Sequence, residues 1–233
     1  MPSTYVITGA SRGLGAEFVR QLSKKGDIVI ACARNTAASE DLAALVDNKT
    51  VYAVDLDTVN PESIKAAVAR IEQLAPQGID TLINNAGIAG SRDADATNTT
   101  AEEYKKVFDT NVIGTSDVTQ AFLPLLRKAS TRRIVNITSV LGSITLANAM
   151  FGPSYRIAKA AENMLGKLFA ETLAGEGFTV LNVHPGYVQT RMGGKDAHIT
   201  PEVSIRGMLS VIEGSTKESN GTFVDYEGKS LPW

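Results

Sequence analysis

Tyr155 and Lys159 are the pair of side chains in this sequence best suited to move a proton. Their spacing of four residues places them on one face of a helix. A free phenol titrates at about pH 10 and a neighbouring ammonium favours its phenolate form, so Tyr155 could give a proton to a carbonyl oxygen or take one from an alcohol. Ser139, after an expected strand, could hold the same oxygen. The set predicts chemistry at a C=O or CH–OH group, although each residue alone also fits a structural role.

A glycine-rich turn near the start of the chain predicts the binding of a dinucleotide. Gly9, Gly13 and Gly15 are spaced G-x-x-x-G-x-G between an expected strand, Tyr5–Thr8, and an expected helix, Leu14–Lys25. Glycines permit a tight turn and a close approach of the backbone to a ligand, and the N-terminus of the following helix favours a pyrophosphate. Strand, turn and helix in this order favour nucleotide binding over an ordinary turn.

The residues after the second expected strand indicate which dinucleotide binds. NAD enzymes place an acidic side chain there, about 20 residues past the glycines, which accepts a hydrogen bond from the ribose 2′-hydroxyl. This sequence has Arg34 and Asn35 instead. A guanidinium can grip a 2′-phosphate, and Arg12 in the glycine turn could assist. The pattern predicts NADP(H); the alternative is that both arginines are solvated surface residues.

The elements that must position these residues alternate between short apolar strands and longer helices. Such alternation is typical of a parallel sheet covered by helices on both faces. We therefore predict an α/β fold, a single doubly wound Rossmann domain with a mostly parallel seven-stranded sheet and with ligands at the carboxyl ends of the strands. The expected strands are 5–8, 27–33, 50–55, 79–84, 133–138, 178–184 and 221–224, and the expected helices are 14–25, 39–46, 61–74, 101–126, 154–173 and 201–214.

Composition excludes several other classes of protein. The chain has 233 residues, of which 43% are hydrophobic and 21% charged, so it can bury a substantial core. Its net charge of −2 provides no basic excess for a nucleic-acid partner. Cys32 is the sole cysteine, which excludes a disulfide framework, and the only histidines are His184 and His198, so we expect no metal site.

The chain also lacks signals that would divide it or direct it to a membrane. No apolar run approaches the ~18 residues that span a bilayer, and no signal peptide is evident, so we expect a cytoplasmic protein without a membrane partner. No linker-like segment interrupts it. We expect one domain over 1–233, with a cofactor half of about 1–135 and a catalytic and substrate half of about 136–233.

A series of ordered motifs resembles the single-domain short-chain dehydrogenase/reductase family over essentially the whole chain. The motifs are the glycine turn, Asn84-Asn85-Ala86-Gly87, Asn111 in Asn-Val-Ile-Gly, Ser139 with Tyr155-Arg156-Ile157-Ala158-Lys159, and Pro185-Gly186 with Thr190. A Tyr-x-x-x-Lys motif alone is common by chance, whereas the ordered series is specific. A narrower resemblance, to sniffer-type carbonyl reductases and C-factor-like proteins, rests on Cys32-Ala33-Arg34-Asn35 and on the C-terminal stretch 221–233.

This resemblance implies an NADPH-dependent carbonyl reductase or ketoreductase. Tyr155 would donate the proton with help from Ser139, Lys159 would also bond the nicotinamide ribose, and Asn111 would anchor a water that relays protons to Lys159. The cofactor-binding residues expected together are Gly9, Ser11, Arg12, Gly13, Leu14, Gly15, Arg34, Asn35, Asp55, Leu56, Asn85, Ala86, Gly87, Tyr155, Lys159, Pro185, Gly186, Val188 and Thr190. For Asp55 the alternative role is to cap a turn.

The substrate is expected to be a small carbonyl compound. The residues expected to line its cleft are Val140, Leu141, Met150, Phe151 and Tyr187, of which Met150 and Phe151 favour an apolar or aromatic compound unless they belong to the core or an interface. Alternatives on the same fold are NADP-dependent alcohol oxidation, a cofactor-binding sensor and a non-redox pathway protein; the complete catalytic set favours redox chemistry.

A second copy of the chain is a further possible partner. The long helices 101–126 and 154–173 permit a homodimer or homotetramer through outward apolar residues, for which core packing is the alternative. The candidate residues are Phe122, Leu126, Met164, Leu168 and Phe169.

Overall fold

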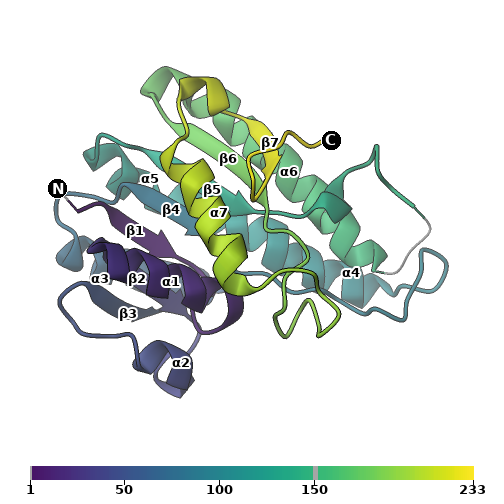
Figure 1. Cartoon of the computed structure of the whole chain (residues 1–233), viewed down its shortest axis with the longest axis horizontal. Coiled ribbons are helices and arrows are strands. Elements are labelled where there is room, and N and C mark those ends of the chain that lie inside the picture. Colours follow the sequence, from purple (N-terminus) through teal and green to yellow (C-terminus); the bar gives the residue numbers. More distant parts are fainter. Residues whose placement is uncertain (1, 149–151) are drawn as a thin grey trace.

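The computed structural model describes residues 2–148 and 152–233, which build a seven-stranded sheet between two layers of helices (Figure 1). The strands are β1 (Thr4–Ile7), β2 (Ile28–Ala33), β3 (Val51–Asp55), β4 (Thr81–Asn84), β5 (Arg133–Ile137), β6 (Thr179–His184) and β7 (Thr222–Asp225). Their order is β3-β2-β1-β4-β5-β6-β7, and every neighbouring pair is parallel. The predicted fold class is therefore confirmed.

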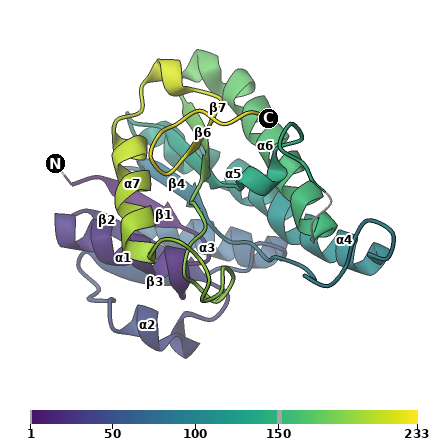
Figure 2. The same cartoon turned by 45° about the vertical axis from the view of Figure 1, so that its right-hand side comes forward.

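Helices cover both faces of this sheet. They are α1 (Gly13–Lys25), α2 (Glu40–Ala43), α3 (Pro61–Leu74), α4 (Ala101–Phe108), α5 (Gly114–Lys128), α6 (Pro153–Leu173) and α7 (Pro201–Glu213). Helices α1 and α7 lie on one face, and α3, α5 and α6 lie on the other, as Figures 1 and 2 show. Successive strand residues point to opposite faces, so Ile7 packs beneath α1 while its neighbour Val6 packs beneath α3 and α5. The continuous apolar strands of the sequence thus supply two cores.

Local sequence signals account for several element ends. Helix α3 begins at Pro61, whose fixed φ suits the first helical position, and the side chain of Asn60 accepts hydrogen bonds from the backbone N–H groups of Glu62 and Ser63. Helix α1 ends at Gly26, which adopts φ +85° in the left-handed region. These boundaries agree with the sequence because the capping groups are local to each helix.

The long helix expected over 101–126 is interrupted. Between α4 and α5 the residues Asp109–Ile113 form a π-helical turn, which shifts the helix phase by one residue. Asn111 lies in this turn and is fully buried, and its amide group accepts from the Ile88 N–H and donates to the Ile88 carbonyl, both at 2.9 Å. The turn directs Asn111 toward the loop after β4, a consequence that a 3.6-residue period does not reveal.

The structure divides the expected outward apolar residues into two groups. Phe122 and Leu126 are wholly buried beneath the sheet, and Phe169 packs partly against the same core. Met164 and Leu168 remain 60% and 56% exposed on α6. Phe122 and Leu126 therefore follow the core-packing alternative, because the face of α5 that carries them docks on the sheet. Over residues 2–148 and 152–233, no helix is both long and apolar enough to cross a membrane.

Candidate active site

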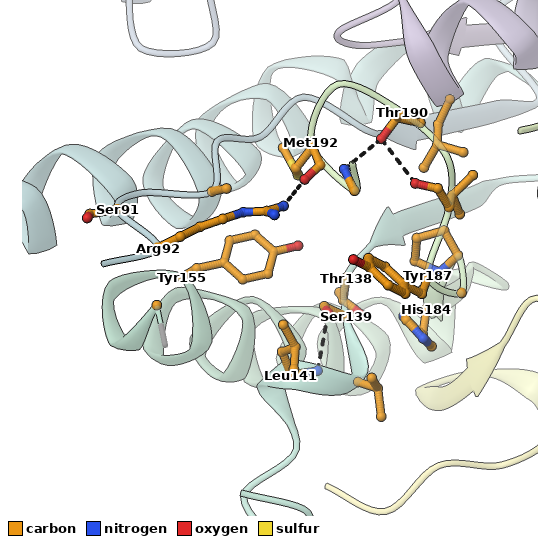
Figure 3. A pocket seen from close by; sticks show the side chains of 18 residues that line it. Ser91, Arg92, Thr138, Ser139, Leu141, Tyr155, His184, Tyr187, Thr190 and Met192 are labelled. Carbon is orange, nitrogen blue, oxygen red and sulfur yellow. Dashed lines mark hydrogen bonds between the residues drawn. The ribbon is translucent and has the colours of Figure 1, made fainter. Parts of the chain in front are cut away.

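A cavity of about 320 Å³ opens beside the carboxyl ends of β5 and β6, where ligands of doubly wound sheets collect (Figure 3). Most of the predicted substrate residues and part of the predicted cofactor set line it. The lining members of the predicted set are Leu14, Ser139, Val140, Leu141, Tyr155, Pro185, Gly186, Tyr187, Val188 and Thr190. The predicted substrate residues Met150 and Phe151 lie outside the described residues.

Ser139 and Tyr155 reach the cavity from different elements. Ser139 follows β5 and opens a 3-10 turn, where its Oγ accepts a hydrogen bond from Leu141 N at 3.1 Å. Gly142, at the end of this turn, packs so tightly on α6 that an added Cβ would lie 2.6 Å from the Lys159 carbonyl carbon. This close approach brings Ser139 beside the first turns of α6, and Figure 3 shows both hydroxyl groups directed into the cavity.

Lys159 is buried behind Tyr155 in an ion pair. Its Nζ donates to the Ile137 carbonyl at 2.8 Å and to Glu162 Oε2 at 2.6 Å, and it lies 5.7 Å from the centre of the Tyr155 ring. Burial opposes the charge on Lys159, but the Glu162 carboxylate and Tyr155 outweigh it and raise the pKa of the ammonium. Burial raises the pKa of Glu162 to about 7 even though Lys159 opposes the shift.

Glu162 is a site residue that was not predicted from the sequence. A Lys and a Glu three residues apart on a helix are usually a surface pair. Here both side chains are at most 5% exposed, because this face of α6 packs toward the end of β5. Its spacing could have indicated this role. Glu162 lies one helical turn after Lys159 and two turns after Tyr155, so all three side chains share one side of the helix.

Asn111 and Lys159 both lie against the backbone of Gly87. An added Cβ at Gly87 would lie 3.3 Å from Asn111 Oδ1 and 3.8 Å from Lys159 Nζ, so the absence of a side chain at Gly87 lets these groups approach. The four residues predicted to be catalytic are therefore brought to one end of the sheet by the loops after β4 and β5, the π-helical turn and α6.

The glycine turn has the shape that a dinucleotide requires. Gly9 adopts φ +65°, and an added Cβ on Gly15 would lie 2.8 Å from the Ala10 Cα, so neither position tolerates a side chain without movement. Asn85 braces the turn by donating its side-chain amide to the carbonyls of Thr8 and Gly9. The N-terminus of α1 has no side-chain cap, which leaves its first N–H groups able to bind an anion. These residues fit a pyrophosphate.

Residues after β2 and β3 form the neighbouring part of the site. Arg12 and Arg34 are both exposed. Asp55 Oδ1 accepts hydrogen bonds from the backbone N–H and the hydroxyl of Thr36, both at 2.8 Å, so this carboxylate holds the turn that follows Arg34. Leu56 is buried, and its N–H donates to the Ala33 carbonyl at 2.8 Å. Asp55 therefore has the turn-capping contacts that were its alternative role.

Several residues line the cavity that were not predicted to do so, and His184 and Arg92 are the two among them with ionisable side chains. His184 ends β6, and burial lowers the pKa of its imidazole to about 4, so the side chain is neutral at physiological pH. Arg92 extends from the loop after β4 across the cavity, above the Tyr155 ring in Figure 3. The sequence could have indicated this position, because Arg92 lies in a loop that follows the carboxyl end of a strand, where ligands of such sheets bind.

Comparisons with known proteins agree with this geometry. The family profile described as short chain dehydrogenase matches residues 3–199. The C-signal protein of Myxococcus xanthus is 41% identical over 155 residues, which cover 66% of this chain and 93% of that protein. Among solved structures, the NADPH-bound carbonyl reductase from chicken fatty liver has a TM-score of 0.92 at 33% identity, with both chains fully covered. The carbonyl reductase Sniffer of D. melanogaster has a TM-score of 0.95 at 30% identity, again over both full chains.

Proposed function

The chain belongs to the short-chain dehydrogenase family, and on this basis we propose that it is an oxidoreductase that uses NADPH to reduce a ketone or an aldehyde to an alcohol. The observation that carries the proposal is the meeting of Ser139 and Tyr155 at one cavity, with the Lys159 ammonium buried behind the Tyr155 ring. Both solved relatives are carbonyl reductases, and one holds NADPH, which supports the reaction and the cofactor.

The hydroxyl groups handle the substrate's oxygen atom. When bound, NADPH would supply the hydride that the carbonyl carbon accepts. Ser139 Oγ accepts its hydrogen bond from Leu141 N, so its own O–H is available to donate to the carbonyl oxygen. Tyr155 donates its proton to the same oxygen as negative charge develops there, and the Lys159 ammonium stabilises the phenolate that remains. In the opposite direction the same residues would oxidise an alcohol.

Asn111 completes the proposed catalytic set by supporting this arrangement. Its amide holds the backbone of Ile88 in place through two hydrogen bonds. Ile88 follows Gly87, whose bare backbone lies against Lys159. Loss of the Asn111 amide would therefore release the loop after β4 from the buried end of Lys159.

The distribution of charge supports NADPH over NADH. Arg12 and Arg34 are exposed beside the glycine turn, and a guanidinium grips a phosphate by charge-assisted hydrogen bonds. Asp55, the acid that ends β3, is turned to Thr36 by its two hydrogen bonds. A 2′-phosphate would thus meet cations rather than a free carboxylate.

The cavity wall supports a carbonyl compound with an apolar body. Most of the cavity surface is apolar, and Leu141, Val188 and Met192 are among the side chains that form it. Tyr187 is 44% exposed and adds an aromatic face. Such a wall binds a substrate mainly by excluding water from apolar surface.

Exposed apolar side chains support the homodimer or homotetramer expected from the sequence. Ile157, Met164 and Leu168 form an exposed stripe along α6, and Phe108 at the end of α4 and Ile113 at the end of the π-helical turn are also exposed. Their burial against a second copy would remove apolar surface from water. Light scattering on the purified protein, compared with a Met164→Glu, Leu168→Glu variant, would measure this assembly directly.

The function is tested by assaying NADPH and NADH oxidation with aromatic aldehydes, aliphatic ketones, α-dicarbonyls and quinones. Turnover that is fast with NADPH, weak with NADH and lost in Tyr155→Phe would support the proposal. Tight NADPH binding without turnover of any of these compounds would contradict a general carbonyl reductase and favour a cofactor-binding protein of another kind.

A further inference from the structure

The cavity wall has one permanently charged side chain among its described lining residues, and that side chain is Arg92. The other lining groups are hydrocarbons, hydroxyls, backbone and the neutral imidazole of His184. We propose that Arg92 forms a subsite for a carboxylate, an inference that rests on the proposed function. The substrate would then be a carbonyl compound with an apolar body and a carboxylate group remote from the reacting carbon.

The base of Arg92 is fixed relative to the proton donor. The preceding residue, Ser91, donates its backbone N–H to Glu103 Oε1 at 2.9 Å. The same oxygen accepts from the hydroxyl of Ser154 at 2.7 Å, and Ser154 immediately precedes Tyr155 on α6. Glu103 therefore ties the loop after β4 to the helix that carries Tyr155. A ligand held by Arg92 would be positioned with respect to the Tyr155 hydroxyl.

The guanidinium is available for an anion. It donates a hydrogen bond to the backbone carbonyl of Met192, which is a neutral acceptor, and none of the described acidic side chains forms an ion pair with it. Figure 3 shows the side chain reaching over Tyr155 toward Met192, so its planar group faces the same space as the phenol. Asp95, a nearby acid in its own loop, is engaged with the N–H and hydroxyl of Thr97.

The chemistry of the group selects a carboxylate. Guanidinium presents several N–H donors in a planar fork that matches the two oxygens of a carboxylate. Arg92 itself is exposed. A ligand that packs on the adjoining apolar wall would shield the ion pair from water, in which an ionic hydrogen bond is weaker. Arg92 comes from the loop after β4, whereas the cationic residues of the proposed cofactor site, Arg12 and Arg34, come from the turns after β1 and β2. A carboxylate at Arg92 is thus separate from the 2′-phosphate.

A matched pair of aldehydes tests this subsite. Initial rates with NADPH are compared for 4-formylbenzoate and its neutral methyl ester, and for the 3-formyl isomers of both. We expect the wild-type protein to prefer the acid, with a kcat/KM ratio that Arg92→Gln lowers by roughly 10- to 100-fold, the effect of losing a charge-assisted hydrogen bond. Arg92→Lys, which keeps the charge but not the fork, should give an intermediate ratio. The control is Lys195→Gln, which removes a neighbouring exposed charge that does not line the cavity.

A binding measurement separates failure of this inference from failure of the proposed function. Calorimetry with benzoate and with methyl benzoate, in the presence of NADP⁺, reports the subsite without turnover. Reduction of both aldehydes with no preference for the acid, or an equal loss of both rates and of NADPH affinity in Arg92→Gln, would overturn the carboxylate subsite and leave the reductase intact. Benzoate binding that depends on Arg92, with neither aldehyde reduced, would support the subsite and count against the reductase. No binding and no reduction would refute both.

Discussion

Replacing Glu162 with glutamine should change how the stability of the protein depends on pH. Glu162 is 1% exposed, and its carboxylate lies 2.6 Å from Lys159 Nζ. Burial raises its pKa to about 7, against 4.5 in the unfolded chain, although the ammonium opposes this shift. The folded protein therefore holds the Glu162 proton more tightly than the unfolded chain does.

The sign and size of the effect follow from this difference. A raised pKa contributes stability that is fully present below about pH 4.5 and is lost as the pH rises through about 7. One pKa unit corresponds to about 1.4 kcal/mol, so the free energy of unfolding that the wild type loses through ionisation of Glu162 is about 3 kcal/mol in total. Glutamine cannot ionise, so Glu162→Gln lacks this loss. The free energy of unfolding of the variant, minus that of the wild type, should rise by about 2 to 3 kcal/mol between about pH 5 and pH 8, because a small part of the loss has already occurred by pH 5.

Urea unfolding at fixed protein concentration, followed by circular dichroism at several pH values, measures this difference. Glu171→Gln is the matched control, because Glu171 lies on the same helix and pairs with Lys167 at the exposed surface. The Lys167 ammonium lowers the pKa of Glu171, so it is ionised throughout this range and the control should follow the wild-type pH dependence.

Two results would refute the reasoning. If the difference in unfolding free energy between Glu162→Gln and wild type stays constant from about pH 5 to pH 8, Glu162 does not titrate in that range in the folded protein. A difference in unfolding free energy that falls as the pH rises from about 3 to about 5 and is then constant would mean that Lys159 stabilises the Glu162 carboxylate by more than burial costs it, so that the pKa is lowered instead.

Further predictions concern the proposed site. Tyr155→Phe should retain NADPH binding, measured by fluorescence titration, and lose carbonyl reduction by about 100-fold or more, because the proton donor is gone; retained turnover would exclude Tyr155 as that donor. Arg34→Gln should raise the Kd for NADPH roughly tenfold and leave that for NADH nearly constant, because one charge-assisted contact to the 2′-phosphate is lost; equal losses would argue against a phosphate contact. Gly15→Ala should weaken NADPH binding about tenfold with the circular dichroism spectrum retained, because its Cβ would lie 2.8 Å from the Ala10 Cα. Gly175→Ala, where the Cβ meets nothing within 4 Å, serves as its control.

The sequence by itself determined the fold class and the identity of most groups at the cavity. Apolar strands alternating with amphipathic helices predict a parallel sheet, because the period of apolar residues reports local geometry directly. The glycine turn and the start of α3 at Pro61 were predictable for the same reason: the backbone freedom of Gly9 and the fixed φ of Pro61 act within a few residues of the chain. The resemblance of the ordered motifs to a known family then predicted that Ser139 and Tyr155 share a site, and both side chains line one cavity.

Tertiary structure alone decided which side of each helix became the interior. Phe122 and Leu126 are core residues, and Glu162 is a buried partner of Lys159 rather than half of a surface pair, because docking of α5 and α6 on the sheet buries those faces. The π-helical turn at Asn111 and the reach of Arg92 across the cavity likewise depend on contacts with segments far away in the sequence. Burial and electrostatic environment are properties of these long-range contacts, and the pattern of residues along one helix does not contain them.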